Sequence, residues 1–183
     1  TPTFRELLRF IDSLESLETT DSPKSPETAG ATTDAIDDRE LRQAAESVLM
    51  MFSDLDKGRL DRAATYLDTI SVVLPDSTLA HYCAGWFYYI TGASDAAVDA
   101  FSHVLHRDDT VWPAHFYRGK LKEVQEPQDA RREFSACIQK IDRFPHHDFR
   151  FIVGGFDPKQ IRALCVRWVE RIDRETTERS HGS

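Results

Sequence analysis

LAHYCAGWFYYITGASDAAVDAFSHVLHRDD, residues 79–109, is the stretch that decides the fold. Apolar residues recur in it at helical steps, first before and then after a turn that contains Gly92. Residues of the same kind recur at an offset of 34 positions, in the pairs Gly58 and Gly92, Gly85 and Gly119, His81 and His115, Ala63 and Ala97, Leu67 and Phe101, and Ile70 and Val104. A period of about 34 residues is typical of repeated helix–turn–helix units.

In this pattern the sequence resembles the tetratricopeptide repeat (TPR) family over about residues 42–142. The second repeat fits best, and its matching residues are Gly85, Tyr88, Ala97, Phe101 and Val104. The first repeat matches at Ala63, Leu67, Ile70 and Pro75, but has Met51 where glycine is expected. The third matches at Gly119 and, after the loss of one residue in its turn, at Ala130, Phe134 and Cys137.

Side-chain size along the repeats agrees with this resemblance. Small residues at Gly85, Ala97, Gly119 and Ala130 are expected to let the two helices of a repeat approach closely. Large residues at Leu67, Phe101 and Phe134 are expected to fill the space between successive repeats. Because no repeat buries its apolar face alone, such a stack needs a cap.

The cap is predicted near the C-terminus. Asp157 followed by Pro158 is a helix start signal, and an apolar stripe follows it. We therefore expect an all-α fold, a TPR-like array of helical hairpins with about three repeats and a capping helix over residues 158–177. One domain, residues 38–183, would contain the array and the cap.

A second apolar stripe lies at the N-terminus, in residues 1–17. It predicts an amphipathic docking helix whose apolar residues are Phe4, Leu7, Leu8, Ile11, Leu14 and Leu17. Residues 18–37 have the composition of a flexible linker, so the helix would be tethered. Three arrangements remain open: the helix covers the repeat domain of its own chain, pairs with another copy in a homodimer, or leaves the domain to a client.

Composition excludes several classes of partner. A net charge of −8 argues against nucleic acid, and no stretch approaches the roughly 20 apolar residues of a membrane span. The three cysteines, Cys83, Cys137 and Cys165, lie far apart in apolar helical contexts, which favours buried thiols over a disulfide framework. With no apolar signal-peptide core at the N-terminus, we expect a cytoplasmic protein without membrane insertion.

Enzyme signatures are missing, so no catalytic residue, metal site or cofactor is predicted. His103 and His106 lie one helical turn apart, but no carboxylate or cysteine joins them at ligand spacing, which favours solvated side chains. His81 and His115 recur at equivalent repeat positions, so packing accounts for both. The segment 144–156, FPHHDFRFIVGGF, fits neither helix nor repeat and is either a packed loop or a partner contact.

The TPR resemblance implies a concave groove lined by the first helix of each repeat. The predicted groove residues are Val48, Phe52, Leu79, Tyr82, Trp86, Tyr89, Phe116 and Lys120. An apolar, aromatic lining of this kind favours a partner with an apolar segment over the acidic tails that basic TPR grooves bind. The alternative is that the protein's own chain covers these residues.

The third repeat, with its acidic turn, aromatic–proline entry and short first helix, also resembles the class II chaperones of bacterial type III secretion. That resemblance implies that a hydrophobic client protein is held in the groove. The leading expectation is therefore a non-enzymatic chaperone or adaptor. The alternative is a structural subunit of a larger assembly that docks through its N-terminal helix.

Overall fold

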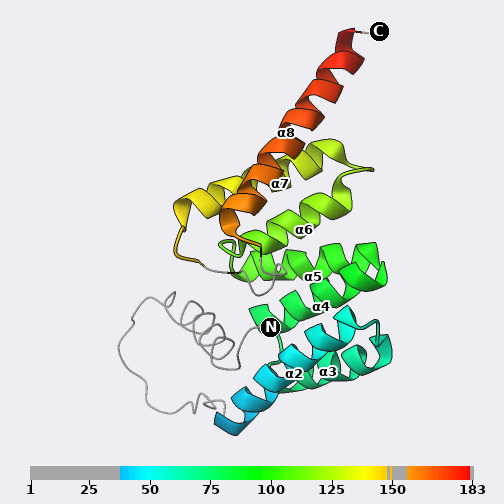
Figure 1. Ribbon diagram of the computed structural model, residues 1–183, viewed down its shortest axis with the longest axis vertical. Helices are drawn as coiled ribbons and strands as arrows, with labels where there is room; N and C mark the ends of the chain where they lie inside the picture. The colour runs from blue at the N-terminus through cyan, green and yellow to red at the C-terminus, as the bar shows by residue number, and fades with distance from the viewer. Residues whose placement is uncertain (1–37, 148, 150–155, 182–183) are drawn as a thin grey trace, which may run out of the picture. The chain divides into compact units, whose positions relative to one another are not determined.

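The structure, a computed structural model, describes residues 38–147, 149 and 156–181, and over these residues it contains helices and no strand (Figure 1). The all-α prediction is confirmed for this part of the chain. The helices are α2 (Asp38–Asp56), α3 (Leu60–Val73), α4 (Thr78–Thr91), α5 (Ser94–Arg107), α6 (Trp112–Lys122), α7 (Pro127–Arg143) and α8 (Pro158–His181). The predicted docking helix, residues 1–17, and the linker, residues 18–37, lie outside the described residues.

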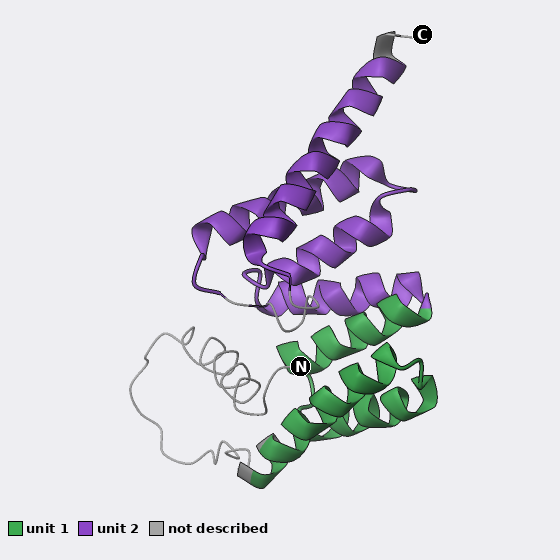
Figure 2. Ribbon diagram, in the orientation of Figure 1, with its two compact units in different colours: residues 1–91 green, residues 92–183 purple. Residues whose placement is uncertain are grey.

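The chain divides into two compact units, residues 1–91 and 92–183, which we call unit 1 and unit 2 (Figure 2). The boundary falls at Gly92, in the turn of the second predicted repeat. Unit 1 contains α2, α3 and α4, and unit 2 contains α5 to α8. The predicted single domain, residues 38–183, spans both units and stays a prediction.

In unit 1, α2 and α3 pack as a hairpin and α4 packs against both. The turn of the hairpin uses Gly58, whose φ of 69° is a left-handed conformation that glycine adopts without steric cost. The carboxylate of Asp54 at the end of α2 is buried and accepts a hydrogen bond from Arg59 Nε at 2.8 Å. It also lies 3.2 Å from Arg62 Nε, so one carboxylate fastens the end of α2 to the start of α3.

The core of unit 1 lies between these three helices. Its fully enclosed side chains include Val48 and Met51 from α2, Ala63 and Ile70 from α3, and Cys83 from α4. Ser77 caps α4 because its Oγ accepts a hydrogen bond from the Ala80 amide at 3.0 Å.

Unit 2 is built around a close approach of α6 to α7. A Cβ added to Gly119 on α6 would lie 2.6 Å from Phe134 Cε1 on α7, which is closer than real side chains tolerate. Phe134 is fully buried and stacks on Trp168 of α8, with ring centroids 4.8 Å apart. The predicted role of Gly119, a small residue that lets neighbouring helices approach, is confirmed.

Helix α8 begins where the sequence predicts, since Asp157 Oδ1 accepts a hydrogen bond from the Lys159 amide at 2.7 Å and Pro158 is the first helical residue. It continues past the predicted end at residue 177 to His181. In Figure 1 its last turns project beyond α6 and α7, and residues 174–179 are exposed.

Two ion pairs on the outside of unit 2 hold α8 to α7. Arg131 donates to Asp173 at 2.5 and 3.0 Å, and Arg162 donates to Asp142 at 2.7 and 2.9 Å. The hydrogen bonds from Arg131 lower the pKa of Asp173, and those from Arg162 lower the pKa of Asp142. Both carboxyls are solvent-accessible, so each pair contributes modestly to the attachment of α8.

These pairs predict an acid-sensitive attachment of α8. A carboxyl whose pKa is lowered by folding stabilises the fold above its unfolded value, about 3.9, and loses that contribution as pH falls through the lower folded value. Between pH 7 and pH 3 we therefore expect the Asp142→Asn, Asp173→Asn double variant to lose less thermal stability than the wild type. Circular dichroism melts measure this, and a constant difference between the two proteins across that range would contradict it.

Candidate protein-binding surface

Three aromatic rings form a stacked row in unit 1. Phe52 on α2 stacks on Trp86 of α4, with centroids 6.0 Å apart and planes 23° apart. Trp86 stacks in turn on Tyr89, with centroids 5.7 Å apart and again 23° between planes. Trp86 and Tyr89 share a face of α4 because they are three residues apart. We call these three residues the aromatic ladder, and each of them is half-buried.

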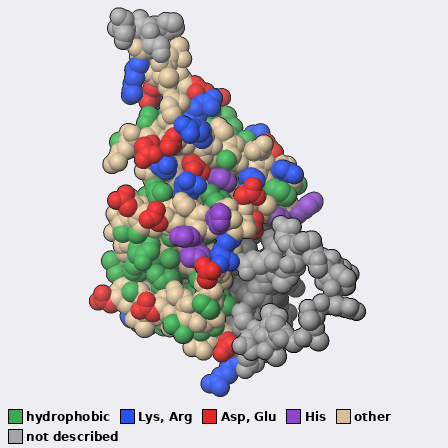
Figure 3. Space-filling model, turned by 180° about the vertical axis from the view of Figure 1, so that it is seen from behind, with side chains coloured by type: hydrophobic (Ala, Val, Ile, Leu, Met, Phe, Trp, Pro, Cys, Tyr) green, Lys and Arg blue, Asp and Glu red, His purple; other side chains and the backbone are tan. Residues whose placement is uncertain are grey.

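The other groove residues predicted in unit 1 are buried more deeply. Val48 is fully buried, and Leu79 and Tyr82 expose only 3% and 2% of their surface. These three side chains therefore expose almost no surface that a partner could contact. Of the groove residues predicted in unit 1, only those of the aromatic ladder are accessible. On the face shown in Figure 3, hydrophobic side chains gather over unit 1, where the exposed large apolar residues of the described helices include Met50, Leu60, Val72 and Ile90.

The two groove residues predicted in unit 2 contact the chain's own α8. The ring centroids of Phe116 and Trp168 lie 5.7 Å apart, and Lys120 Nζ lies 4.4 Å from the Trp168 ring centroid. Trp168 therefore occupies the face of α6 that the sequence assigned to a partner. The sequence identified α8 as a cap but not this contact, because helical periodicity does not say which residues of two helices meet.

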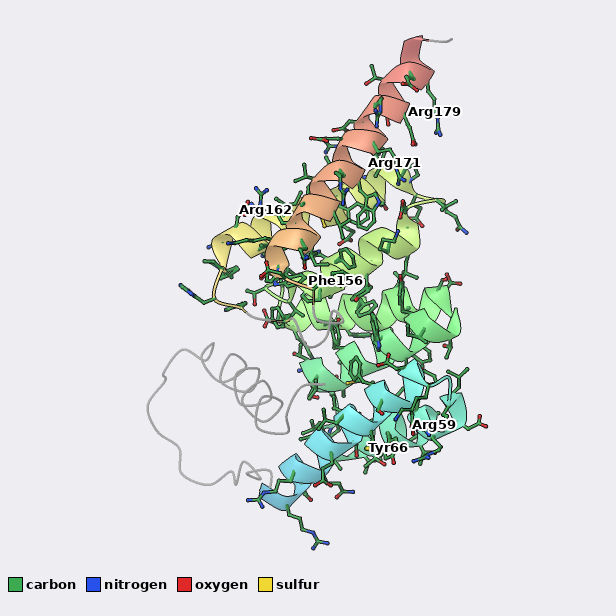
Figure 4. The ribbon with its side chains drawn as sticks, in the orientation of Figure 1. Arg59, Tyr66, Phe156, Arg162, Arg171 and Arg179 are labelled. Atoms are coloured by element: carbon green, nitrogen blue, oxygen red, sulfur yellow. The ribbon has the colours of Figure 1, made fainter. Side chains whose placement is uncertain are left out.

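A charged network borders Trp168 on the same side. Glu123 at the end of α6 accepts hydrogen bonds from Lys120, at 2.5 Å, and from Arg171 of α8, which Figure 4 labels. Burial raises the pKa of Glu123, but the hydrogen bonds from Lys120 and Arg171 outweigh it, so the pKa is lowered overall. Lys120, the one basic residue of the predicted lining, is thus already paired within unit 2.

No protein-family model matches this chain, and no curated protein matches its sequence. The TPR and secretion-chaperone resemblances therefore rest on the sequence pattern alone. Among the described helices, none has the length and apolar character that a membrane crossing requires.

A histidine–carboxylate pair joins α6 to α7 in unit 2. His115 Nδ1 lies 2.8 Å from Glu133 Oε2, and Arg118 contacts the other oxygen of Glu133 at 3.1 Å. The second ring nitrogen of His115, Nε2, is buried without a hydrogen-bond partner. Sequence reasoning assigned His115 to packing but could not identify Glu133, which lies 18 residues away on the next helix.

In the part of the chain that the structure describes, the other histidines and the cysteines do not form a metal site. His103 and His106 are exposed on α5, and within the described residues no group of three His, Cys, Asp or Glu side chains is placed to hold a metal ion. Cys83 is fully buried on α4, and burial raises the pKa of its thiol. The prediction that the three cysteines are buried thiols is confirmed.

Part of the segment 144–156 packs against helix α6 within unit 2. Phe149 is 4% exposed and places its ring edge-on to Trp112, with centroids 5.8 Å apart. The Phe149 ring also lies edge-on to the ring of His147, with centroids 6.0 Å apart. Phe156 at the end of the segment is half exposed (Figure 4). The contact of Phe149 with Trp112 favours the packed-loop interpretation for this residue.

Proposed function

We propose that this chain is a non-enzymatic protein-binding module, a chaperone or adaptor of TPR-like architecture, that binds an apolar peptide or helix on unit 1. The observation that carries the proposal is the aromatic ladder of Phe52, Trp86 and Tyr89. Aromatic side chains dominate the energetics of protein interfaces, since they bury a large area while fixing only two side-chain torsions.

The geometry of the ladder suits an apolar partner in particular. Stacking already restricts the three rings, so binding costs little additional side-chain entropy. The ladder joins two helices, α2 and α4, and therefore offers a surface that a single helix would not. In the TPR interpretation these are the first helices of successive repeats, which line the concave face.

The client proposed is a protein segment with bulky apolar side chains. The resemblance to class II secretion chaperones supports a hydrophobic secreted protein as one such client. The acidic net charge of −8 supports a client that is apolar or basic over an acidic one.

Selection of displayed peptides against the full chain tests this proposal. We expect enrichment of sequences rich in aromatic and aliphatic residues, whose affinity falls about 30-fold or more in the Trp86→Ala, Tyr89→Ala variant, since interface tryptophan and tyrosine typically contribute 2 kcal/mol or more. Fluorescence titration of the selected peptides measures the change. Trp86→Phe, which retains a stacking ring, should lose only a few-fold.

The matched control is Val72→Ala, which removes an apolar side chain that is 79% exposed on α3 of the same unit. It should bind as the wild type does. Undiminished binding by a helical Trp86→Ala, Tyr89→Ala variant, or equal losses in this variant and in Val72→Ala, would rule out the ladder as the binding surface.

A further inference from the structure

Helices α7 and α8 run antiparallel in unit 2, and their side-chain contacts fix how the two helices are aligned. Residues nearer the C-terminus of α7 contact residues nearer the N-terminus of α8. The contacting pairs are Gln128 with Thr176 at 2.9 Å, Arg131 with Asp173 at 2.5 Å, Phe134 with Trp168 at 4.8 Å between ring centroids, and Asp142 with Arg162 at 2.7 Å.

This alignment brings two cysteines together. One turn beyond Phe134 on α7 stands Cys137, and one turn before Trp168 on α8 stands Cys165. Both are fully buried, and after burial itself the nearby Cys165 is the largest influence that raises the pKa of the Cys137 thiol. The residues at the next matching step, Ile141 and Ile161, are buried as well, so the thiols meet inside the apolar seam between the helices.

We propose that Cys137 and Cys165 form a reversible disulfide that ties α8 to α7 when the chain encounters a peroxide-type oxidant. The alignment of α7 with α8 places the two thiols opposite each other, and a disulfide requires the sulfurs to close to about 2.05 Å with Cα atoms roughly 4.4–6.8 Å apart. The third cysteine, Cys83, lies in unit 1 and takes no part.

The oxidation balances with one molecule of hydrogen peroxide. The first sulfur attacks a peroxide oxygen, the O–O bond breaks, and the thiol becomes a sulfenic acid while one water leaves. The second sulfur then displaces that hydroxyl as a second water, and the S–S bond forms. The two thiols lose two protons and two electrons in total, and a thiol reductant reverses the reaction by exchange.

Burial sets the rate of this reaction. Burial raises the pKa of the Cys137 thiol well above its ordinary value, and the hydrogen bond to Cys165 raises it further. A neutral buried thiol reacts slowly, so oxidation proceeds through transient opening of the α7–α8 seam. Once formed, the bond keeps Trp168 against Phe116 and Lys120, the face of α6 that a partner could reach only if α8 left.

Differential alkylation of the full chain tests the proposal. Reduced protein is treated with hydrogen peroxide, unfolded, alkylated with N-ethylmaleimide and weighed by mass spectrometry. We expect oxidised protein to carry one alkyl group, on Cys83, whereas reduced protein carries three. Peptide mapping should place the cross-link between residues 137 and 165, and the melting temperature should rise by roughly 10 °C and fall back with reductant.

The cysteines supply matched controls. Cys83→Ala should form the bond as the wild type does, whereas Cys137→Ala and Cys165→Ala should not. Treatment is repeated in a sub-denaturing concentration of urea, which opens the seam more often and should accelerate bond formation. The proposal is overturned if no cross-link forms even in urea, if the thiols proceed only to sulfinic acid, or if the cross-links that form contain Cys83.

Discussion

Phe134→Ala is expected to destabilise unit 2 by about 3–5 kcal/mol. The side chain is fully buried between Trp168, on which it stacks, and Gly119, whose missing side chain provides its space. Removing the ring takes away apolar burial and leaves a cavity between α6, α7 and α8 that rigid helices refill poorly. Urea unfolding followed by circular dichroism measures the loss.

Val124→Ala is the control for this prediction. Val124 belongs to the same unit but is 89% exposed, so its replacement should change the free energy of unfolding by no more than about 0.5 kcal/mol. A loss below about 1 kcal/mol for Phe134→Ala would show that the ring is not a central part of the packed core.

Gly119→Ala is expected to destabilise unit 2 by about 1–3 kcal/mol, although alanine is the better helix former. The added Cβ would lie 2.6 Å from Phe134 Cε1 and 2.8 Å from Cδ1, so either the ring or the whole of α7 must move. Because Trp168 stacks against Phe134, movement of the ring also disturbs α8.

A double-mutant cycle identifies the cause of that loss. Phe134→Leu removes the ring atoms nearest to Gly119, so the added methyl group should cost less in the Phe134→Leu background than in the wild type. A coupling free energy of 0.5 kcal/mol or more is expected for residues in contact. Additive losses would mean that Gly119 is required for a reason other than its contact with Phe134.

Much of the local structure could be predicted from sequence because it depends on nearby residues. The start of α8 follows from Asp157 and Pro158, which fix a helix N-terminus through their own chemistry. Glycine at position 58 follows from a turn that needs a positive φ. The close approach at Gly119 could also be predicted, because the 34-residue repeat pairs it with another glycine.

Contacts between helices were less predictable. The apolar stripe of α8 shows in the sequence which side of this helix meets α7. How far the two helices are shifted along their axes depends instead on the connecting residues 144–157 and on pairs such as Arg131 with Asp173. The meeting of Cys137 with Cys165 depends on that alignment, as does the placement of Trp168 over Lys120. In unit 1 the helical faces of the ladder residues were predictable, whereas the deeper burial of Tyr82 was not.

The lengths of the connections between helices bear on the order in which they assemble. Helices α2 and α3 are joined by residues 57–59 alone, so their contacts close a very short loop. Helices α7 and α8 are separated by residues 144–157, the longest connection between the helices described. Since loop-closure entropy must be overcome before distant contacts form, the α2–α3 hairpin is favoured as an early folding nucleus, and α8 is favoured to dock late.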